Sequence, residues 1–285
     1  MTWRKSTSTW TLAVIFLSSL PVLQAQQQAW SDQEKPMADQ LHGLRALPDD
    51  VRAGTTRRLA IEIRALPAKS SKLRLAENLA NLSTEGDFGH DTLQEVATTL
   101  AGAIHENPAE AEKDQAYAEL AQLVRYEHVR VELDDPHLRA ALSQLESDDE
   151  IRQKADFTLT DLQGKRWTLK SLTGKAVLVN FWATWCPPCR KEMPDLQALH
   201  ERFGDQLVIL AISDEDADKV KAFLAGRNVT YPILLDPGRK VNELFRIEGI
   251  PKSFVYDRQG KLVAQAIDMR TRKQFLDMLG KAGLH

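Results

Sequence analysis

Cysteine and closely spaced histidine are scarce in this chain, and their scarcity limits the sites that it can build. The 285 residues include only two cysteines, Cys186 and Cys189. A structural zinc ion needs four ligands, usually two C-x-x-C pairs or one such pair with two histidines at short spacing. A second cysteine pair is missing, and the histidines are single: His42, His90, His105, His128, His137, His200 and His285. The sequence therefore predicts no metal site.

Long apolar runs are also missing, except near the beginning of the chain. The mainly apolar stretch 10–23 has 14 residues, fewer than the ~20 that a transmembrane helix needs. Arg4 and Lys5 precede it and Ala25 follows it, an arrangement typical of a secretory signal peptide. We expect residues 1–25 to be cleaved on export to the periplasm. Their retention as an N-terminal membrane anchor is the alternative.

An excess of positive charge is likewise absent. The formal net charge is −3 at pH 7, whereas proteins that bind nucleic acid carry surplus lysine and arginine to neutralise phosphates. The sequence therefore gives no sign of nucleic-acid binding. At roughly 100 to 200 residues per domain, the length predicts two domains.

Residues 26–150 lack strand-like alternation and have few aromatic side chains, but apolar residues recur there at helical spacing. Five stripes predict five helices: Leu59, Ile63 and Leu66; Leu75, Leu79 and Leu82; Leu93, Val96, Ala97, Leu100 and Ile104; Tyr117, Leu120, Ala121 and Val124; Leu138, Leu142 and Leu145. Helix-start patterns occur at three places: Asp91 with Gln94, Asn107 with Pro108, and Asp135 with Pro136. We expect an all-α domain of helical hairpins, with an unidentified partner, and a junction near residues 145–156.

The two cysteines follow an apolar segment in the stretch VLVNFWATWCPPCRKEMPDL. Residues 177–181 are almost all apolar or β-favouring, as in a strand that is buried on both faces. Two prolines follow the first cysteine, and proline is tolerated in the first turn of a helix because the N–H groups there lack intrahelical partners. The spacing of Leu196, Leu199 and Phe203 predicts a helix over 187–203. The expected order is strand, short turn, helix.

This order gives the two cysteines different roles. Cys186 lies at the N-terminus of the expected helix, where the dipole and free N–H groups favour the thiolate, the species that attacks disulfides. Cys189 lies one turn further in, less exposed and placed to resolve a mixed disulfide. A structural disulfide is the alternative, but a loop of four residues removes little chain entropy. We therefore interpret the pair as a redox-active disulfide.

The motif FWATWCPPC followed by RKEMPDL resembles the thioredoxin superfamily, and specifically the TlpA/ResA-like group of exported thiol-disulfide oxidoreductases. Later segments agree in order: a strand over 206–213, a helix over 216–229, a strand over 231–236, a hairpin over 249–267 and a last helix over 270–283. The resemblance covers residues 151–285. It implies an α/β thioredoxin-like domain there, with a central mixed sheet flanked by helices.

The resemblance also implies which residues form the site. Pro251 matches a cis proline that faces the cysteine pair and offers its backbone as a docking edge for an extended protein substrate. Trp185 would cover one side of the exposed Cys186 sulfur. The other residues expected to contact substrate are Pro187, Pro188 and Ile250. No organic cofactor is implied, and the electrons would come from a donor outside the chain, such as a membrane relay.

Two positions depart from the wider superfamily. Asn180 stands where thioredoxin has a buried aspartate that accepts the proton of the resolving thiol, and an asparagine cannot accept it. In the ResA-like branch this role falls to a glutamate after the following strand, which alignment places at Glu215. Asp214 and Asp216 flank Glu215, so a solvated acidic helix start is the alternative. Lys252, where relatives often have threonine, either biases the substrate groove towards acidic partners or is a neutral surface change.

Together these features predict an exported enzyme that exchanges disulfides with protein substrates, and the resemblance favours reduction. Two other classes stay open. A thiol peroxidase shares the fold, but it needs its first cysteine within a P-x-x-x-T-x-x-C loop, and here the prolines follow that cysteine. In the other class, residues 26–150 bind a partner and the redox domain locks or reports the complex.

Overall fold

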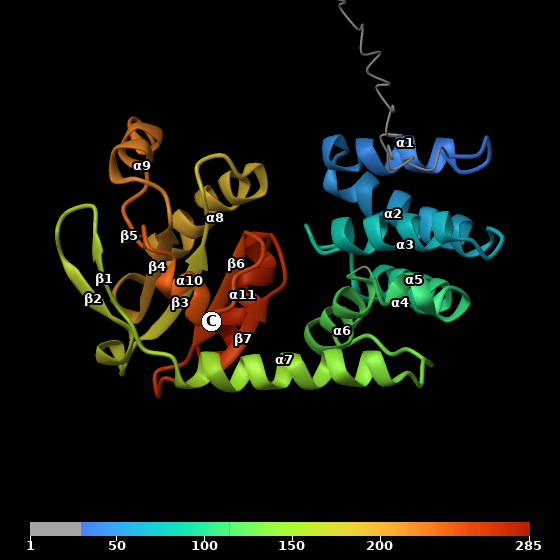
Figure 1. Cartoon of the computed structure of the whole chain (residues 1–285). Helices are drawn as coiled ribbons and strands as arrows, with labels where there is room; N and C mark the ends of the chain where they lie inside the picture. Colours follow the sequence, from blue (N-terminus) through green and yellow to red (C-terminus); the bar gives the residue numbers. More distant parts are fainter. Residues whose placement is uncertain (1–29, 114) are drawn as a thin grey trace, which may run out of the picture.

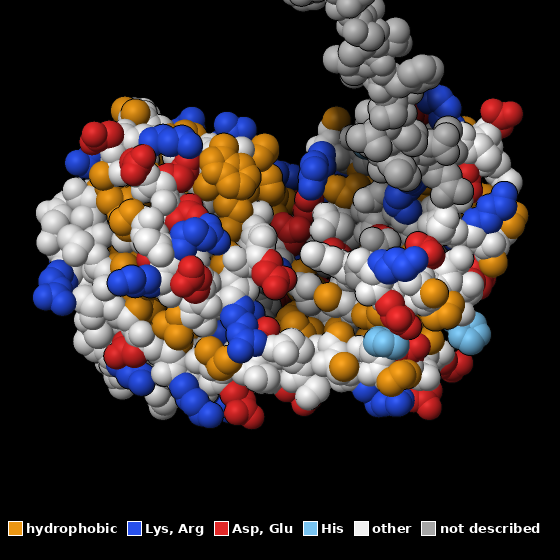
Figure 2. Space-filling view, in the orientation of Figure 1, with side chains coloured by type: hydrophobic (Ala, Val, Ile, Leu, Met, Phe, Trp, Pro, Cys, Tyr) orange, Lys and Arg blue, Asp and Glu red, His pale blue; other side chains and the backbone are white. Residues whose placement is uncertain are grey.

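The computed structural model of this chain describes residues 30–113 and 115–285, so the predicted leader lies outside the described residues. Figure 1 shows a helical half, residues 30–154, beside a sheet half, residues 155–285, and Figure 2 shows a hollow between them. The helical half contains α1 (Lys35–Gly43), η1 (Leu44–Ala46), α2 (Asp49–Arg64), α3 (Ser70–Ser83), α4 (His90–Glu106), α5 (Pro108–Ala111), α6 (Ala116–Tyr126) and α7 (Pro136–Lys154). Across both described ranges, none of the helices is long and apolar enough to cross a bilayer.

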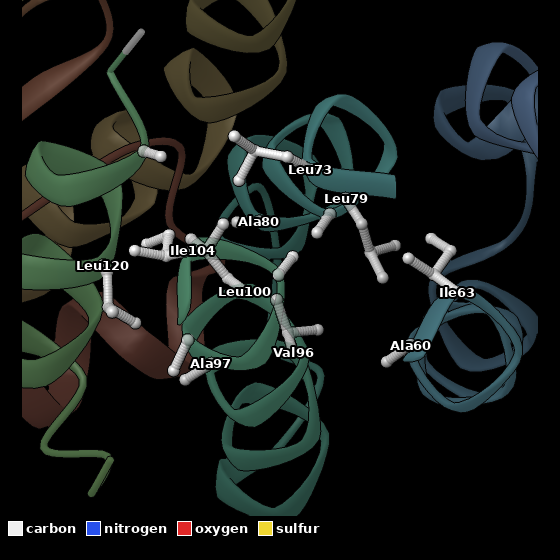
Figure 3. Close-up of a cluster of buried hydrophobic side chains, with 14 of the residues drawn as sticks. Ala60, Ile63, Leu73, Leu79, Ala80, Val96, Ala97, Leu100, Ile104 and Leu120 are labelled. Carbon is white, nitrogen blue, oxygen red and sulfur yellow. The ribbon is translucent and has the colours of Figure 1, made fainter. Parts of the chain in front are cut away.

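The helical half has an apolar core between the facing sides of its helices. Figure 3 shows side chains gathered there, including Ile63 of α2, Leu79 of α3 and Leu100 of α4. The five predicted apolar stripes lie on α2, α3, α4, α6 and α7, except that Leu66 follows the end of α2. The expected helical character of this region is confirmed. Short helices are marginal alone in water, so it is burial of these stripes that holds the hairpins together.

The predicted helix starts are confirmed at two places and wrong at one. Asn107 is the N-cap of α5, and the Asp135 carboxylate at the N-cap of α7 accepts a backbone N–H from two residues later at 2.7 Å. Helix α4 instead begins one residue before Asp91, with Gly89 at the N-cap. Gly89 has a positive φ of 76°, which glycine adopts without steric cost. The chain therefore turns into α4 earlier than the acidic residue suggested.

Among the described residues, the sheet half contains a mixed sheet of seven strands in the order β2–β1–β5–β4–β3–β6–β7. Strand β4 is parallel to β3 and β5, whereas the other neighbours are antiparallel. The elements are β1 (Thr158–Asp161), β2 (Arg166–Thr168), η2 (Leu169–Leu172), β3 (Ala176–Phe181), α8 (Pro187–Phe203), η3 (Gly204–Gln206), β4 (Leu207–Ser213), α9 (Ala217–Leu224), β5 (Ile233–Leu235), α10 (Lys240–Leu244), β6 (Lys252–Tyr256), β7 (Leu262–Ala266) and α11 (Arg272–Lys281). The predicted mixed sheet flanked by helices is confirmed.

The bounds of single elements agree with the expectations to different degrees. The helix predicted over 187–203 is confirmed in full as α8. The helix predicted over 216–229 is shorter, because α9 ends at Leu224 and the chain turns at Gly226, where φ is 76°. Glycine favours this left-handed backbone, so it ends the helix despite the helical pattern beyond it.

Strand β3 lies at the centre of the sheet and separates two apolar layers. Ala176 and Leu178 belong to the layer that contains the cysteines and α8, whereas Val177 and Phe181 belong to the layer on the other face. Successive strand residues point to opposite faces. Asn180 therefore faces the α8 side, a polar group at the centre of an apolar strand.

Helix α7 joins the two halves and runs along both of them (Figure 1). Near its C-terminal end, Arg152 donates to the carbonyl oxygen of Phe245 at 3.0 Å, and Asp148 forms an ion pair with Arg246. The predicted junction at 145–156 is thus helical over most of its length. These contacts tie the C-terminal end of the helix to the sheet half, whereas its earlier residues pack in the helical core. We therefore propose that the domain boundary lies within α7, ahead of Asp148, rather than at residue 150.

A fragment of residues 136–285 is expected to fold alone and to be more stable than a fragment of residues 151–285. Only the longer fragment keeps the Asp148–Arg246 ion pair and the 2.6 Å hydrogen bond from Gln265 to Asp149. A hydrogen bond to a charged group contributes about 1.5 to 3 kcal/mol, so the free energies of unfolding in urea should differ by roughly 2 kcal/mol or more. Equal stability of the two fragments would return the boundary to residue 150.

Candidate active site

The two cysteines form a disulfide where β3 leads into α8, with their Sγ atoms 2.05 Å apart. Cys186 is the N-cap residue of the helix, and Pro187 and Pro188 occupy its first turn. The backbone N–H of Cys189 donates to the Cys186 sulfur, with 3.2 Å between nitrogen and sulfur. After reduction, this N–H and the positive end of the helix dipole stabilise negative charge on Cys186. The local geometry supports Cys186 as the attacking thiolate.

The Ile250–Pro251 peptide bond is cis, as the resemblance implied. The Ile250 carbonyl oxygen lies 3.8 Å from the Cys186 sulfur. Strand β6 begins immediately afterwards and pairs with β3, which brings the proline to the end of β3 where the cysteine turn starts. The structure therefore brings Cys186 and the expected docking edge together from positions that are 64 residues apart in the chain.

Exposure of the site differs from the expectation. Cys186 and Cys189 are each only 2% exposed, so the exposed sulfur that we predicted is wrong for the disulfide form. Trp182 and Ala183 are buried in the same apolar cluster as the sulfurs, whereas Trp185 is 64% exposed. Tryptophan is one of the residues enriched at protein–protein interfaces. The exposed group beside the disulfide is therefore the indole of Trp185 rather than sulfur.

A buried carboxyl group, that of Glu192, lies one turn of α8 beyond Cys189. Glu192 is 1% exposed, and the i, i+3 spacing puts it on the same side of the helix as Cys189. Its Oε1 accepts the backbone N–H of Arg270 at 2.6 Å, and its Oε2 lies 3.4 Å from the amide nitrogen of Asn180. Burial raises the pKa of Glu192 to about 8, and nearby Asp268 acts in the same direction, whereas the bonds from Arg270 and Asn180 oppose the rise.

Unlike Asn180, this carboxyl group is able to take up a proton. A cysteine thiol ordinarily titrates near pH 8.5, so a carboxyl group with a pKa of about 8 can exchange a proton with it at little cost in free energy. Sequence reasoning missed Glu192 because it belongs to the charged run RKE, which is typical of a solvated helix face. The signal that was available is its i+3 spacing from Cys189 on a helix that had been predicted correctly.

Glu215 makes different contacts. Its carboxylate accepts the backbone N–H of Thr184 at 2.5 Å and the Thr184 hydroxyl at 2.9 Å, and it pairs with Lys219 at 2.5 Å. Burial opposes ionisation, but the bonds from Lys219 and Thr184 outweigh it and hold the pKa of Glu215 below its ordinary value. The side chain is only 7% exposed, so the alternative of a solvated helix start is wrong. These contacts favour a role in fixing the turn before Cys186.

A polar cleft of about 390 Å³ lies between the helical half and the docking edge, at the hollow in Figure 2. Its walls include Pro188, Ile250, Pro251 and Lys252 from the sheet half and Asn81, Gln115, Glu119 and Gln122 from the helical half. The Lys252 ammonium donates to the Gln122 side chain at 3.3 Å, and burial lowers its pKa to about 8. Lys252 thus contributes to the cleft rather than to an open surface.

Neither here nor elsewhere in the described ranges do three or more His, Cys, Asp or Glu side chains gather to hold a metal ion.

A mixed sheet with a cis proline facing a C-x-x-C disulfide at a helix N-terminus defines a thioredoxin-like thiol-disulfide protein. Residues 151–265 match the AhpC/TSA family. The thiol-disulfide oxidoreductase ResA of Bacillus thuringiensis strain Al Hakam is 37% identical over 132 residues, which cover 46% of this chain and 76% of that protein. ResA of Bacillus subtilis strain 168 is 33% identical over 142 residues, 49% of this chain and 79% of that protein. The chain belongs to the ResA-like thiol-disulfide oxidoreductases.

A solved structure is similar over the same share of the chain. The exposed lipoprotein thioredoxin Etrx1 of Streptococcus pneumoniae strain TIGR4 is 30% identical, with coverage of 45% of this chain and 99% of that chain and a TM-score of 0.41. The match to the AhpC/TSA family begins at residue 151 and ends at residue 265. Almost all of the helical half and the segment that leads into α11 lie outside it.

Proposed function

We propose that this chain is an exported enzyme that reduces disulfide bonds in protein substrates through the dithiol of Cys186 and Cys189. One observation carries the proposal: the disulfide lies at the N-terminus of α8, against the cis Ile250–Pro251 bond and one helical turn from the buried Glu192. A nucleophile, a docking edge and a proton acceptor are the three groups that the reaction needs.

The reaction proceeds in two displacements. The Cys186 thiolate attacks one sulfur of the substrate disulfide, and the other substrate sulfur leaves as a thiolate that takes a proton from water. When Glu192 is ionised, Cys189 passes its proton to this carboxylate and attacks the Cys186 sulfur, which releases the second substrate sulfur. Two electrons move from the dithiol to the substrate, and the chain ends with its own disulfide formed.

A thiol donor outside the chain must return the disulfide to the dithiol, because each turnover consumes two electrons. We place this donor at a membrane, on the exported side. The leader pattern in residues 1–25 supports export, and in an oxidising compartment reduced thiols need a continuous supply of electrons.

We assign substrate recognition partly to the helical half, since it forms the wall of the cleft opposite Pro251. A polypeptide that docks along the Ile250–Pro251 edge would meet Glu119 and Gln122 on α6 as well as Lys252. The same cleft also supports a second candidate function. In that function, the helical half binds a partner and the redox domain locks the complex. The two differ in turnover, because a locking domain reacts once and a reductase reacts repeatedly.

Reduction of insulin disulfides tests the proposal. With dithiothreitol as the electron supply, the wild-type chain should accelerate insulin precipitation over many turnovers, and a variant with both cysteines changed to serine should not. Equilibration with a glutathione buffer gives the direction: a potential near the −270 mV or so of thioredoxin supports a reductant, and one near about −120 mV contradicts it. A wild-type rate equal to that of the double variant would leave the locking function as the better explanation.

A further inference from the structure

We infer that Arg270 is a positioning residue through which the helical half holds the carboxyl group of Glu192 in place for thiol exchange. The inference deepens the proposed function and rests on it only for the role of Glu192. Arg270 lies five residues beyond the end of the AhpC/TSA family match, in the segment between β7 and α11. The residue that contacts Glu192 therefore lies outside the region of this chain that matches the family.

The backbone of Arg270 faces the active site. Its N–H donates to Glu192 Oε1 at 2.6 Å, a short distance for a hydrogen bond to a carboxyl group. Within the described part of the chain, the other carboxyl oxygen has a longer contact, at 3.4 Å, with the amide of Asn180. The position of residue 270 therefore has a large influence on where the carboxyl group lies and on how readily it ionises.

The side chain of Arg270 faces the helical half. It is 6% exposed, forms an ion pair with the largely buried Glu127, and donates to the carbonyl oxygen of Thr84 at 3.4 Å. Glu127 follows α6 and Thr84 follows α3. A buried guanidinium depends on such partners, because its desolvation is costly when they are removed. The helical half thus fixes the side chain whose backbone holds Glu192.

Two further contacts join the same surfaces without reaching Glu192. Lys273 pairs with Asp87 at 2.6 Å, with the lysine largely exposed, and the Gln274 side chain donates to the Gly86 carbonyl oxygen at 3.2 Å. The segment 84–87 of the helical half therefore contacts the start of α11 at several points. The Lys273–Asp87 pair is a matched control, since it crosses the same interface but belongs to neither Arg270 nor the site.

The groups that face Glu192 come from several elements. Asn180 on β3 and the backbone and charge of Arg270 favour its ionised form, whereas burial and Asp268 favour the neutral form. Tyr231, just before β5, is close enough for Glu192 to raise the pKa of its hydroxyl group. Displacement of Arg270 removes both a hydrogen bond and a positive charge from Glu192, so its pKa must rise.

The test uses the full chain and follows the infrared C=O band of the protonated Glu192, identified by its loss in Glu192→Gln, between pH 5 and pH 10. Arg270→Met and Glu127→Gln should each raise the apparent pKa, lowering the ionisation constant by about threefold or more. Removing the negative charge of Glu127 without any displacement would instead lower the pKa. A rise in Glu127→Gln therefore reports displacement of Arg270 specifically.

The remaining variants fix the interpretation. Arg270→Lys should restore part of the shift, and Asp87→Asn should leave the ionisation unchanged. In the Arg270→Met background, Glu127→Gln should cause no further rise in the pKa of Glu192, because both variants raise it through one contact. A fall or no change in Glu127→Gln, or an equal effect of Asp87→Asn, would overturn the inference, and this holds even if Arg270→Met does not fold. A shifted ionisation with an unchanged rate of mixed-disulfide resolution would instead overturn the role of Glu192 in the proposed function.

Discussion

Replacing Cys186 with serine is expected to abolish disulfide exchange, with a loss of rate of at least about 10³-fold, as for removal of a covalent nucleophile. Cys189→Ser should behave differently, because it leaves the first attack intact and removes the thiol that resolves the intermediate. This variant should accumulate mixed disulfides with its substrates. Non-reducing electrophoresis and mass spectrometry of the trapped species measure both outcomes.

The alkylation rates of the two reduced cysteines check the same assignment without a substrate. Cys186 receives the N–H of Cys189 and the positive end of the α8 dipole, so its thiolate fraction at neutral pH should be the larger. Equal alkylation rates for the two sulfurs would contradict the division of roles. Partners captured by Cys189→Ser would also identify the chemistry that the cleft recognises.

Glu192→Gln is expected to slow resolution of the mixed disulfide by about 10²-fold, the lower end of the usual contribution of a positioned proton acceptor. The first attack by Cys186 should change little. The glutamine carries no negative charge, so it does not oppose ionisation of the nearby thiols as the Glu192 carboxylate does. The apparent thiol pKa should therefore fall. Rapid-quench measurement of the two displacements separates these effects.

The matched control is Glu215→Gln, because Glu215 is the glutamate that the sequence predicted as proton acceptor and is held by Thr184 and Lys219. It should leave the resolution rate within a few-fold of wild type and change mainly the stability of the turn before Cys186. Slower resolution in Glu215→Gln with a normal rate in Glu192→Gln would restore Glu215 as the proton acceptor.

The dependence of stability on pH gives a second measurement on Glu192→Gln. Burial raises the pKa of Glu192 from 4.5 to about 8, so the folded chain keeps a proton that the unfolded chain loses. The contribution of this proton to the free energy of unfolding is fully present below pH 4.5 and is lost as the pH rises towards 8. Glu192→Gln has no such proton, so urea unfolding should show it gaining stability relative to wild type between pH 5 and pH 8.

Local patterns in the sequence were sufficient for the C-x-x-C turn and for five helices of the helical half, although not for α1. The run of apolar residues before Cys186, the two prolines after it and the spacing of Leu196 and Phe203 act within a few residues of each other, and α8 has the predicted bounds. The apolar stripes of the helical half are local in the same sense. Helical periodicity is set by neighbouring turns, so a single sequence can reveal it.

The identity of the buried acid, by contrast, depended on contacts between distant segments. Glu192 and Glu215 both follow a plausible start of a helix or turn. The i+3 spacing from Cys189 singles out Glu192, but spacing does not show whether a carboxyl group is buried. Packing against β3 and the Arg270 segment removes Glu192 from water and raises its pKa, whereas Lys219 and Thr184 stabilise the charge of Glu215. The ionisation of a carboxyl group depends on its solvation and its neighbours, and both are products of the tertiary fold.

By itself, the sequence determined the C-x-x-C pair at a helix start, the strands from β3 onwards and the helical character of the first half, because each depends on residues that are close in the chain. Strands β1 and β2 and helix α10 were not predicted. Only the tertiary structure decided which carboxyl group near the cysteines is buried with a raised pKa, that Lys252 contributes to a cleft, and that Arg270 contacts both Glu192 and the helical half. Glu127 and Arg270 are 143 residues apart. No local periodicity pairs them, because it is the packing of the two halves along α7 that brings their charges together.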